Sequence, residues 1–127
     1  MPAPDEAPQA ETSRPVVYGY LRLEEPDNDQ IAMLCKELSS YCAEAGFLLA
    51  SVFVDREVPG KQVKRPGFAG VIDVLDLASS HGVVVPHLDH LSIDNEVLAF
   101  LRRLIRRRGS VLLVVHEEED LVKADGP

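Results

Sequence analysis

The run Val16-Val17-Tyr18-Gly19-Tyr20-Leu21-Arg22-Leu23 comes directly after Pro15 and decides how the rest of the chain is read. It is rich in β-branched and aromatic residues, which favour a strand. Apolar residues occupy both alternating sets of positions, so both faces of the strand should be covered. The run therefore predicts a mostly buried first strand at the centre of a sheet.

Helical and extended patterns alternate after this run. Asp27 or Asn28 can cap a first helix that Gly46 ends, and Asp94 can cap the last helix, which Gly109 ends. The predicted segments are helices over 29–45, 66–78 and 94–108, and strands over 47–55, 83–85 and 111–115, with a break over 79–82. The order βαβαβαβ predicts an α/β three-layer sandwich around a mostly parallel sheet of four strands or slightly more.

Length and charge indicate one folded domain between two acidic ends. The chain has 127 residues, of which 46% are hydrophobic and 27% are charged, as in ordinary globular domains. Of the net charge of -8, residues 1–13 carry -3 and residues 116–127 carry -4. We expect a disordered acidic tail over 1–14, a domain over 15–116 and an acidic C-terminal tail over 117–127. Such acidity disfavours general binding of nucleic acid.

Nothing in the sequence indicates a membrane span or a secretion signal, because no apolar run approaches roughly 18 residues and the N-terminus lacks a basic region before an apolar one. Cys35 and Cys42 lie about 10 Å apart along one predicted helix, too far to form a disulfide. We expect reduced thiols and a cytoplasmic protein. The preference for Arg over Lys, with much Ala and Val, is typical of a GC-rich bacterial genome.

Ligands of open parallel sheets bind beyond the carboxyl ends of the strands, which directs attention to 22–30, 55–65, 87–92 and the residues after 115. The first of these segments contains Glu24-Glu25-Pro26-Asp27-Asn28-Asp29, which is acidic and has no glycine. It cannot cradle a phosphate as a Gly-rich loop does. We therefore expect no nucleotide and no cofactor.

Several blocks of sequence at these positions form an informative series. They are Tyr20-Leu21-Arg22-Leu23, Gln30 with its helix, Phe53-Val54-Asp55-Arg56-Glu57-Val58-Pro59-Gly60-Lys61, Arg65-Pro66-Gly67-Phe68, and Val84-Val85-Pro86-His87-Leu88-Asp89-His90-Leu91-Ser92. In order and spacing, over about residues 15–115, they resemble the catalytic domain of the serine recombinases, the resolvase and invertase family. The resemblance implies a resolvase-like fold.

The resemblance also implies where this chain departs from the family. The family's nucleophilic serine would lie two residues after the strand arginine, where this chain has Glu24, and two family arginines correspond to His90 and Ile93. Arginine forks neutralise the charge that develops on a phosphoryl group. These replacements shift the site by about three charge units toward negative. We therefore expect an inactive member of the family that is not an enzyme.

Arg22, Asp55, Arg65 and Asp89 match active-site positions of the family. One interpretation is a vestigial anion site, and the other is a structural network that pairs the arginines with Asp or Glu24. Both stay open.

Two further arrangements near this segment are weak. His87-Leu88-Asp89-His90 holds residue types that bind metals, but no partner cluster of known spacing accompanies it, so we predict no metal site. A hydrolase triad of Ser92, His90 and Asp89 is too local in sequence to converge on one atom.

A basic band is predicted on the outer face of the last helix, opposite its apolar face. The basic residues there are Arg102, Arg103, Arg106, Arg107 and Arg108, and we call the first four, which are the candidate contact residues, the arginine band. It could contact nucleic acid or a partner, or it could be a solvated face whose arginines favour the helix C-terminus and pair with an acidic tail. The run Glu117-Glu118-Glu119-Asp120 is likewise either a solvated end or a mimic of nucleic acid.

Two functions from different classes follow. The first is a protein-interaction or regulatory module with an unidentified protein partner or a second copy of the chain. The alternative is a DNA-associated accessory protein of recombination or transcription that uses the arginine band. No membrane partner is expected.

Overall fold

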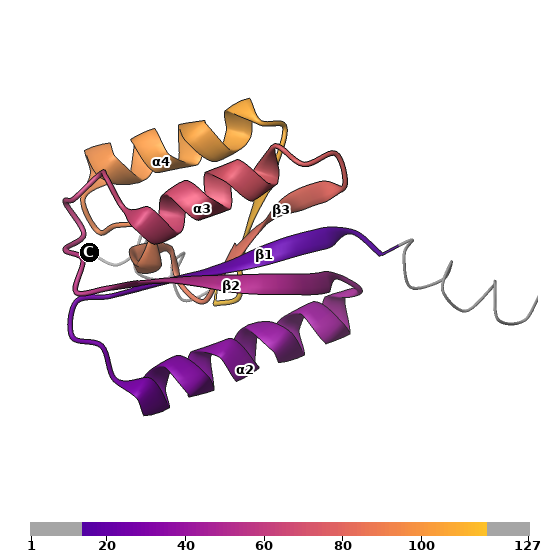
Figure 1. Ribbon diagram of the computed structural model, residues 1–127, viewed down its shortest axis with the longest axis horizontal. Coiled ribbons are helices and arrows are strands. Elements are labelled where there is room, and N and C mark those ends of the chain that lie inside the picture. The colour runs from indigo at the N-terminus through magenta and orange to yellow at the C-terminus, as the bar shows by residue number, and fades with distance from the viewer. Residues whose placement is uncertain (1–13, 117–127) are drawn as a thin grey trace, which may run out of the picture.

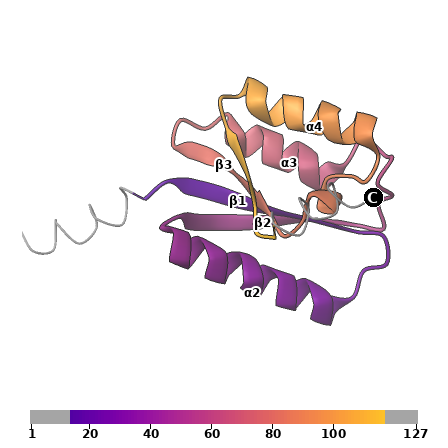
Figure 2. The same cartoon turned by 180° about the vertical axis from the view of Figure 1, so that it is seen from behind.

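The computed structural model describes residues 14–116 as a four-stranded parallel sheet with the strand order β2-β1-β3-β4. The elements in chain order are β1 (Val16–Leu23), α2 (Asn28–Ala45), β2 (Leu48–Arg56), α3 (Pro66–Leu75), β3 (Ser80–Val85), the short 3-10 helix η1 (Leu88–His90), α4 (Asn95–Arg107) and β4 (Val111–Val114). Helix α2 covers one face of the sheet, while α3 and α4 cover the other (Figures 1 and 2). The predicted α/β class and the element order are confirmed.

β1 lies inside the sheet because its two faces are both apolar. Tyr18 and Tyr20 belong to the core cluster under α3 and α4, whereas Val17 and Leu21 belong to the cluster under α2. Between the latter two, a Cβ on Gly19 would lie 2.8 Å from a methyl carbon of Leu38 in α2. The predicted central strand is therefore confirmed, and its glycine lets α2 pack closely against the sheet.

The predicted helix caps are largely confirmed. The side chain of Asp27 accepts hydrogen bonds from the backbone N–H groups of Asp29 and Gln30, and Asp94 caps α4 in the same way. Gly46 ends α2 with a φ of 85°, in the left-handed region that glycine adopts without strain. These local signals place the helix ends within about one turn.

One predicted break is wrong. Helix α3 ends at Leu75 rather than near Ala78, and β3 begins at Ser80, inside the segment that was expected to interrupt the chain. Gly82 is part of β3, where a Cβ would lie only 2.2 Å from the backbone oxygen of Val111. The glycine thus marks a close approach of β4 rather than a loop.

The cysteines are free, with Cys42 buried and Cys35 half-buried, and burial raises the pKa of the Cys42 thiol. Within residues 14–116, no helix is long and apolar enough to cross a membrane. The predicted tails, Arg14 aside, and the run Glu117-Glu118-Glu119-Asp120 lie outside the described residues.

Candidate functional site at the carboxyl edge of the sheet

Arg22, near the carboxyl end of β1, holds the surrounding loops together. Its side chain is only 8% exposed. Nη1 donates a hydrogen bond to the carbonyl oxygen of Val58 at 2.9 Å, and Nη2 donates to the carbonyl oxygen of Asp89 at 2.7 Å. The arginine thereby fastens the segments that follow β2 and β3 to β1.

Glu24 supplies the carboxylate that pairs with this arginine. Its Oε2 lies 3.2 Å from Nη1 of Arg22, and its side chain is 61% exposed. The Nε of Arg22 is buried and has no hydrogen-bond partner among the described residues. In contrast to Nε, both terminal nitrogens of Arg22 donate to oxygen atoms of the chain itself.

A polar hollow of about 390 Å³ opens beside this ion pair. The residues that line it are Arg22, Leu23, Glu24, Glu25, Gln30, Asp89 and His90. Three carboxylates and one guanidinium leave the hollow with a negative charge near neutral pH. Such a surface favours cations over phosphate groups.

Asp55, at the carboxyl end of β2, is 3% exposed and accepts hydrogen bonds from three directions. The hydroxyl of Tyr20 donates to it at 2.7 Å, and the backbone N–H groups of Gly67 and Phe68 donate at 2.6 and 3.0 Å. Burial, followed by the hydrogen bond to Asp55, raises the pKa of Tyr20. Asp55 thus stabilises the start of α3 through orphan backbone donors of its first turn.

Arg65 is also 3% exposed, and the loop before α3 occupies its donors. Nε donates to the carbonyl oxygen of Gln62 at 2.6 Å, Nη2 to that of Gly60 at 2.8 Å, and Nη1 to the hydroxyl of Tyr20 at 3.4 Å. Among the described ion pairs, Arg22 joins Glu24, but Arg65 reaches Asp55 only through Tyr20.

Tyr20 is the member of this arrangement that the sequence analysis did not assign to the site. Its hydroxyl accepts from Arg65 and donates to Asp55 across sequence separations of 45 and 35 residues. The available signal was a tyrosine in a strand expected to be buried, since a buried tyrosine hydroxyl requires a partner, but this signal does not identify the partner.

His90 is buried and serves as an acceptor. Its Nδ1 accepts the backbone N–H of Arg22 at 3.1 Å, and desolvation lowers its pKa to about 4, so the ring is neutral near pH 7. Ile93 is 80% exposed. Neither position adds a cation to the site.

The weaker arrangements do not form among the described residues. The hydroxyl of Ser92 donates to the carbonyl oxygen of Gly60 at 2.9 Å and accepts from the backbone N–H of Asp94, so it is engaged with backbone rather than with His90. The ring of His87 stacks on that of His116 with centroids 4.5 Å apart. In the part of the chain described, no three metal-ligating side chains group together.

The arginine band lies on the outer side of α4, and all four of its residues are exposed. Two hollows of about 320 and 280 Å³ share Arg102 and Arg106 in their linings. The structure therefore places these arginines together on one surface, apart from the carboxyl-edge hollow.

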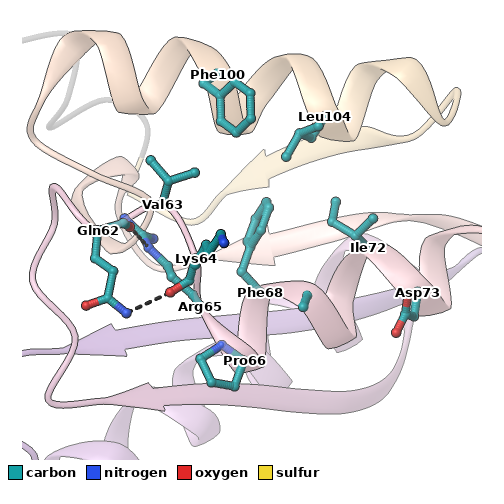
Figure 3. Close-up of a pocket in the computed structure, with 11 residues that line it drawn as sticks. Gln62, Val63, Lys64, Arg65, Pro66, Phe68, Ile72, Asp73, Phe100 and Leu104 are labelled. Atoms are coloured by element: carbon teal, nitrogen blue, oxygen red, sulfur yellow. Dashed lines mark hydrogen bonds between the residues drawn. The ribbon is translucent and has the colours of Figure 1, made fainter.

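A larger and mostly apolar hollow of about 630 Å³ lies between α3 and α4 (Figure 3). Phe68 and Ile72 of α3 face Phe100 and Leu104 of α4 across it. The guanidinium of Arg65 donates to backbone and Tyr20 oxygens, so the charged side chains left in the lining are those of Lys64 and Asp73. No sequence pattern predicts this hollow, because its walls come from two helices and the loop before α3.

Comparisons with known proteins agree with this geometry. The family described as "Resolvase, N terminal domain" has a model that matches residues 17–126. No curated protein matches the chain.

Solved structures share its fold. The C-terminal catalytic domain of ISC1926 TnpA, an IS607-like serine recombinase, has a TM-score of 0.70 at 18% identity over 86% of this chain and 80% of that one. The N-terminal catalytic domain of TP901-1 integrase has a TM-score of 0.71 at 19% identity over 80% of this chain and 79% of that one. The first open reading frame of transposon ISC1904 from Sulfolobus solfataricus P2 has a TM-score of 0.63 at 21% identity over 85% of this chain and 76% of that one.

Proposed function

The chain belongs to the resolvase N-terminal domain family, and from this premise we propose that it does not cleave DNA and works as a protein-interaction or regulatory module in the cytoplasm. The observation that carries the proposal is the ion pair of Glu24 with Arg22 at 3.2 Å, because the resemblance to the family assigns Glu24 to the position of the nucleophilic serine. A carboxylate there cannot act as that hydroxyl nucleophile, and it adds negative charge where a phosphodiester would have to lie.

The hydrogen bonds of Arg22, Arg65 and Asp55 support the same proposal. Arg22 and Arg65 donate to oxygen atoms of the chain, and Asp55 accepts from α3 and Tyr20. Phosphoryl transfer needs donors directed at the phosphoryl oxygens. These residues instead hold loops in place. The apolar hollow between α3 and α4 offers exposed apolar surface of the kind that protein partners cover.

A plasmid-nicking assay tests the absence of cleavage. Supercoiled plasmid incubated with the full chain should stay supercoiled, and Glu24→Ser alone should not restore nicking, because the arginines remain committed to other oxygens and His90 and Ile93 supply no cation. Nicking by the unaltered chain that disappears in Arg22→Ala would overturn the proposal.

The second candidate is a DNA-associated accessory protein of recombination or transcription. The observation in its favour is that the arginine band is exposed and makes no ion pair within residues 14–116. Duplex binding through phosphates would weaken steeply as salt rises. On logarithmic axes, the binding constant would fall against salt concentration with a slope of about the number of phosphate contacts. Binding of a DNA duplex that is lost when the residues of the arginine band are replaced by alanine would support this candidate.

A further inference from the structure

The outer face of α4 differs in charge from the rest of the chain. The chain as a whole carries a net charge of -8, yet the hollow of about 320 Å³ is lined by Arg102, Arg103 and Arg106 with Asn95, Leu98 and Ala99. The adjoining hollow of about 280 Å³ is lined by Arg102, Ile105, Arg106, Ser110, Val111 and Leu112. Neither lining contains a carboxylate.

The positive charge of this surface is not compensated within the described residues. Arg108, one position beyond α4, pairs with Asp76 at 3.4 Å, whereas the four residues of the arginine band take part in no ion pair there. Exposed arginines side by side repel one another unless an anion lies between them. The band is thus ready to accept negative charge from outside the described domain.

We propose that the arginine band and its two hollows bind an acidic segment of a partner protein in which carboxylates alternate with small apolar side chains. This rests on the proposed interaction function and names its partner class. Arg102 and Arg106 are four positions apart on α4, a rise of about 6 Å. Carboxylates two positions apart on an extended segment have nearly the same spacing, about 6.6 Å.

The apolar part of the two linings favours protein over nucleic acid. Leu98, Ala99, Val111 and Leu112 offer contacts for apolar side chains, and neither lining has an aromatic ring on which a base could stack. A short acidic segment fits on the band alone. A duplex carries one charge per about 1.7 Å, whereas residues 14–116 other than the arginine band carry a net charge of -5, which disfavours contacts with phosphates beyond the band.

Fluorescence anisotropy with a labelled peptide that repeats Glu-Leu-Glu-Ala tests the proposal. The full chain should bind this peptide, and the double variant Arg102→Ala, Arg106→Ala should lose about tenfold in affinity. The matched control is Lys36→Ala, Lys61→Ala, which removes the same charge from exposed sites elsewhere. Its affinity should stay within about twofold of that of the unaltered chain, measured in parallel.

Three outcomes would overturn the proposal. An equal loss in both double variants would mean that only net charge matters. Tighter binding of a short DNA duplex than of the peptide at the same salt would assign the band to nucleic acid. A tenfold gain when Glu117, Glu118, Glu119 and Asp120 are replaced by their amides would place the chain's own acidic run on the band. All three leave the plasmid assay unaffected, so failure here is distinct from failure of the non-cleaving function.

Discussion

Arg22 illustrates at the scale of one residue how a largely buried cation is held by oxygen atoms of its own chain. A guanidinium is always charged, so a largely buried one needs oxygen partners. Here two carbonyl oxygens and the carboxylate of Glu24 supply them. The arginine thereby connects β1 to the two loops that follow β2 and β3.

His90 leads to a prediction about stability and pH. Burial holds its pKa at about 4 in the folded chain, below the value of about 6.5 for an unfolded histidine. Between these values the unfolded state binds more protons, so the free energy of unfolding should fall as pH decreases from about 6.5 to 4, by at most about 1.4 kcal/mol per pH unit. Urea unfolding at a series of pH values measures this slope.

His90→Asn is the matched variant for this measurement. The amide oxygen can take the place of Nδ1 as acceptor for the backbone N–H of Arg22, and it does not titrate in this range. The variant should lose the part of the slope that belongs to His90. An identical pH profile in both proteins would contradict the assignment.

At the scale of elements, local signals and long-range contacts differ in how well they could be predicted. The caps Asp27 and Asp94 and the stop at Gly46 are set by neighbouring residues, so the sequence pattern identified them. Gly82 was misread as part of a break, because its role depends on Val111, which lies on another strand. A glycine in a short apolar run indicates either a loop or a close approach, and only the partner strand decides between them.

Gly82→Ala should therefore weaken the attachment of β4. A Cβ would lie 2.2 Å from the backbone oxygen of Val111, and backbone cannot move aside as a flexible side chain can. We expect a loss of about 2 kcal/mol or more in the free energy of unfolding. Gly109→Ala, where φ is 71° but no atom lies within 4 Å, is the control and should cost about 1 kcal/mol. Equal losses in thermal or urea unfolding would show that the close approach is unimportant.

At the scale of the whole molecule, two surfaces of opposite charge lie at opposite ends of the sheet. The hollow with Glu24, Glu25 and Asp89 lies at the carboxyl edge. Because β3 and β4 are parallel, α4 runs back toward the amino ends, so the arginine band in its second half lies away from that hollow.

The location of the site, but not its internal contacts, could be predicted from the sequence. Parallel strands bring their carboxyl ends to one edge, which was enough to group Arg22, Asp55 and Asp89. The Tyr20 hydroxyl bridges Arg65 and Asp55 across more than 30 residues. No local pattern encodes such a bridge, so its role became evident only in the folded chain.

The most direct test of the non-cleaving function counts covalent protein–DNA adducts on supercoiled plasmid after denaturation. Any side chain that attacked a phosphodiester as a nucleophile would remain joined to the DNA. We predict no adduct above background for the full chain or for Glu24→Ser. An adduct with the unaltered chain that is lost in Arg22→Ala would contradict the account and restore the domain to the cleaving members of its family.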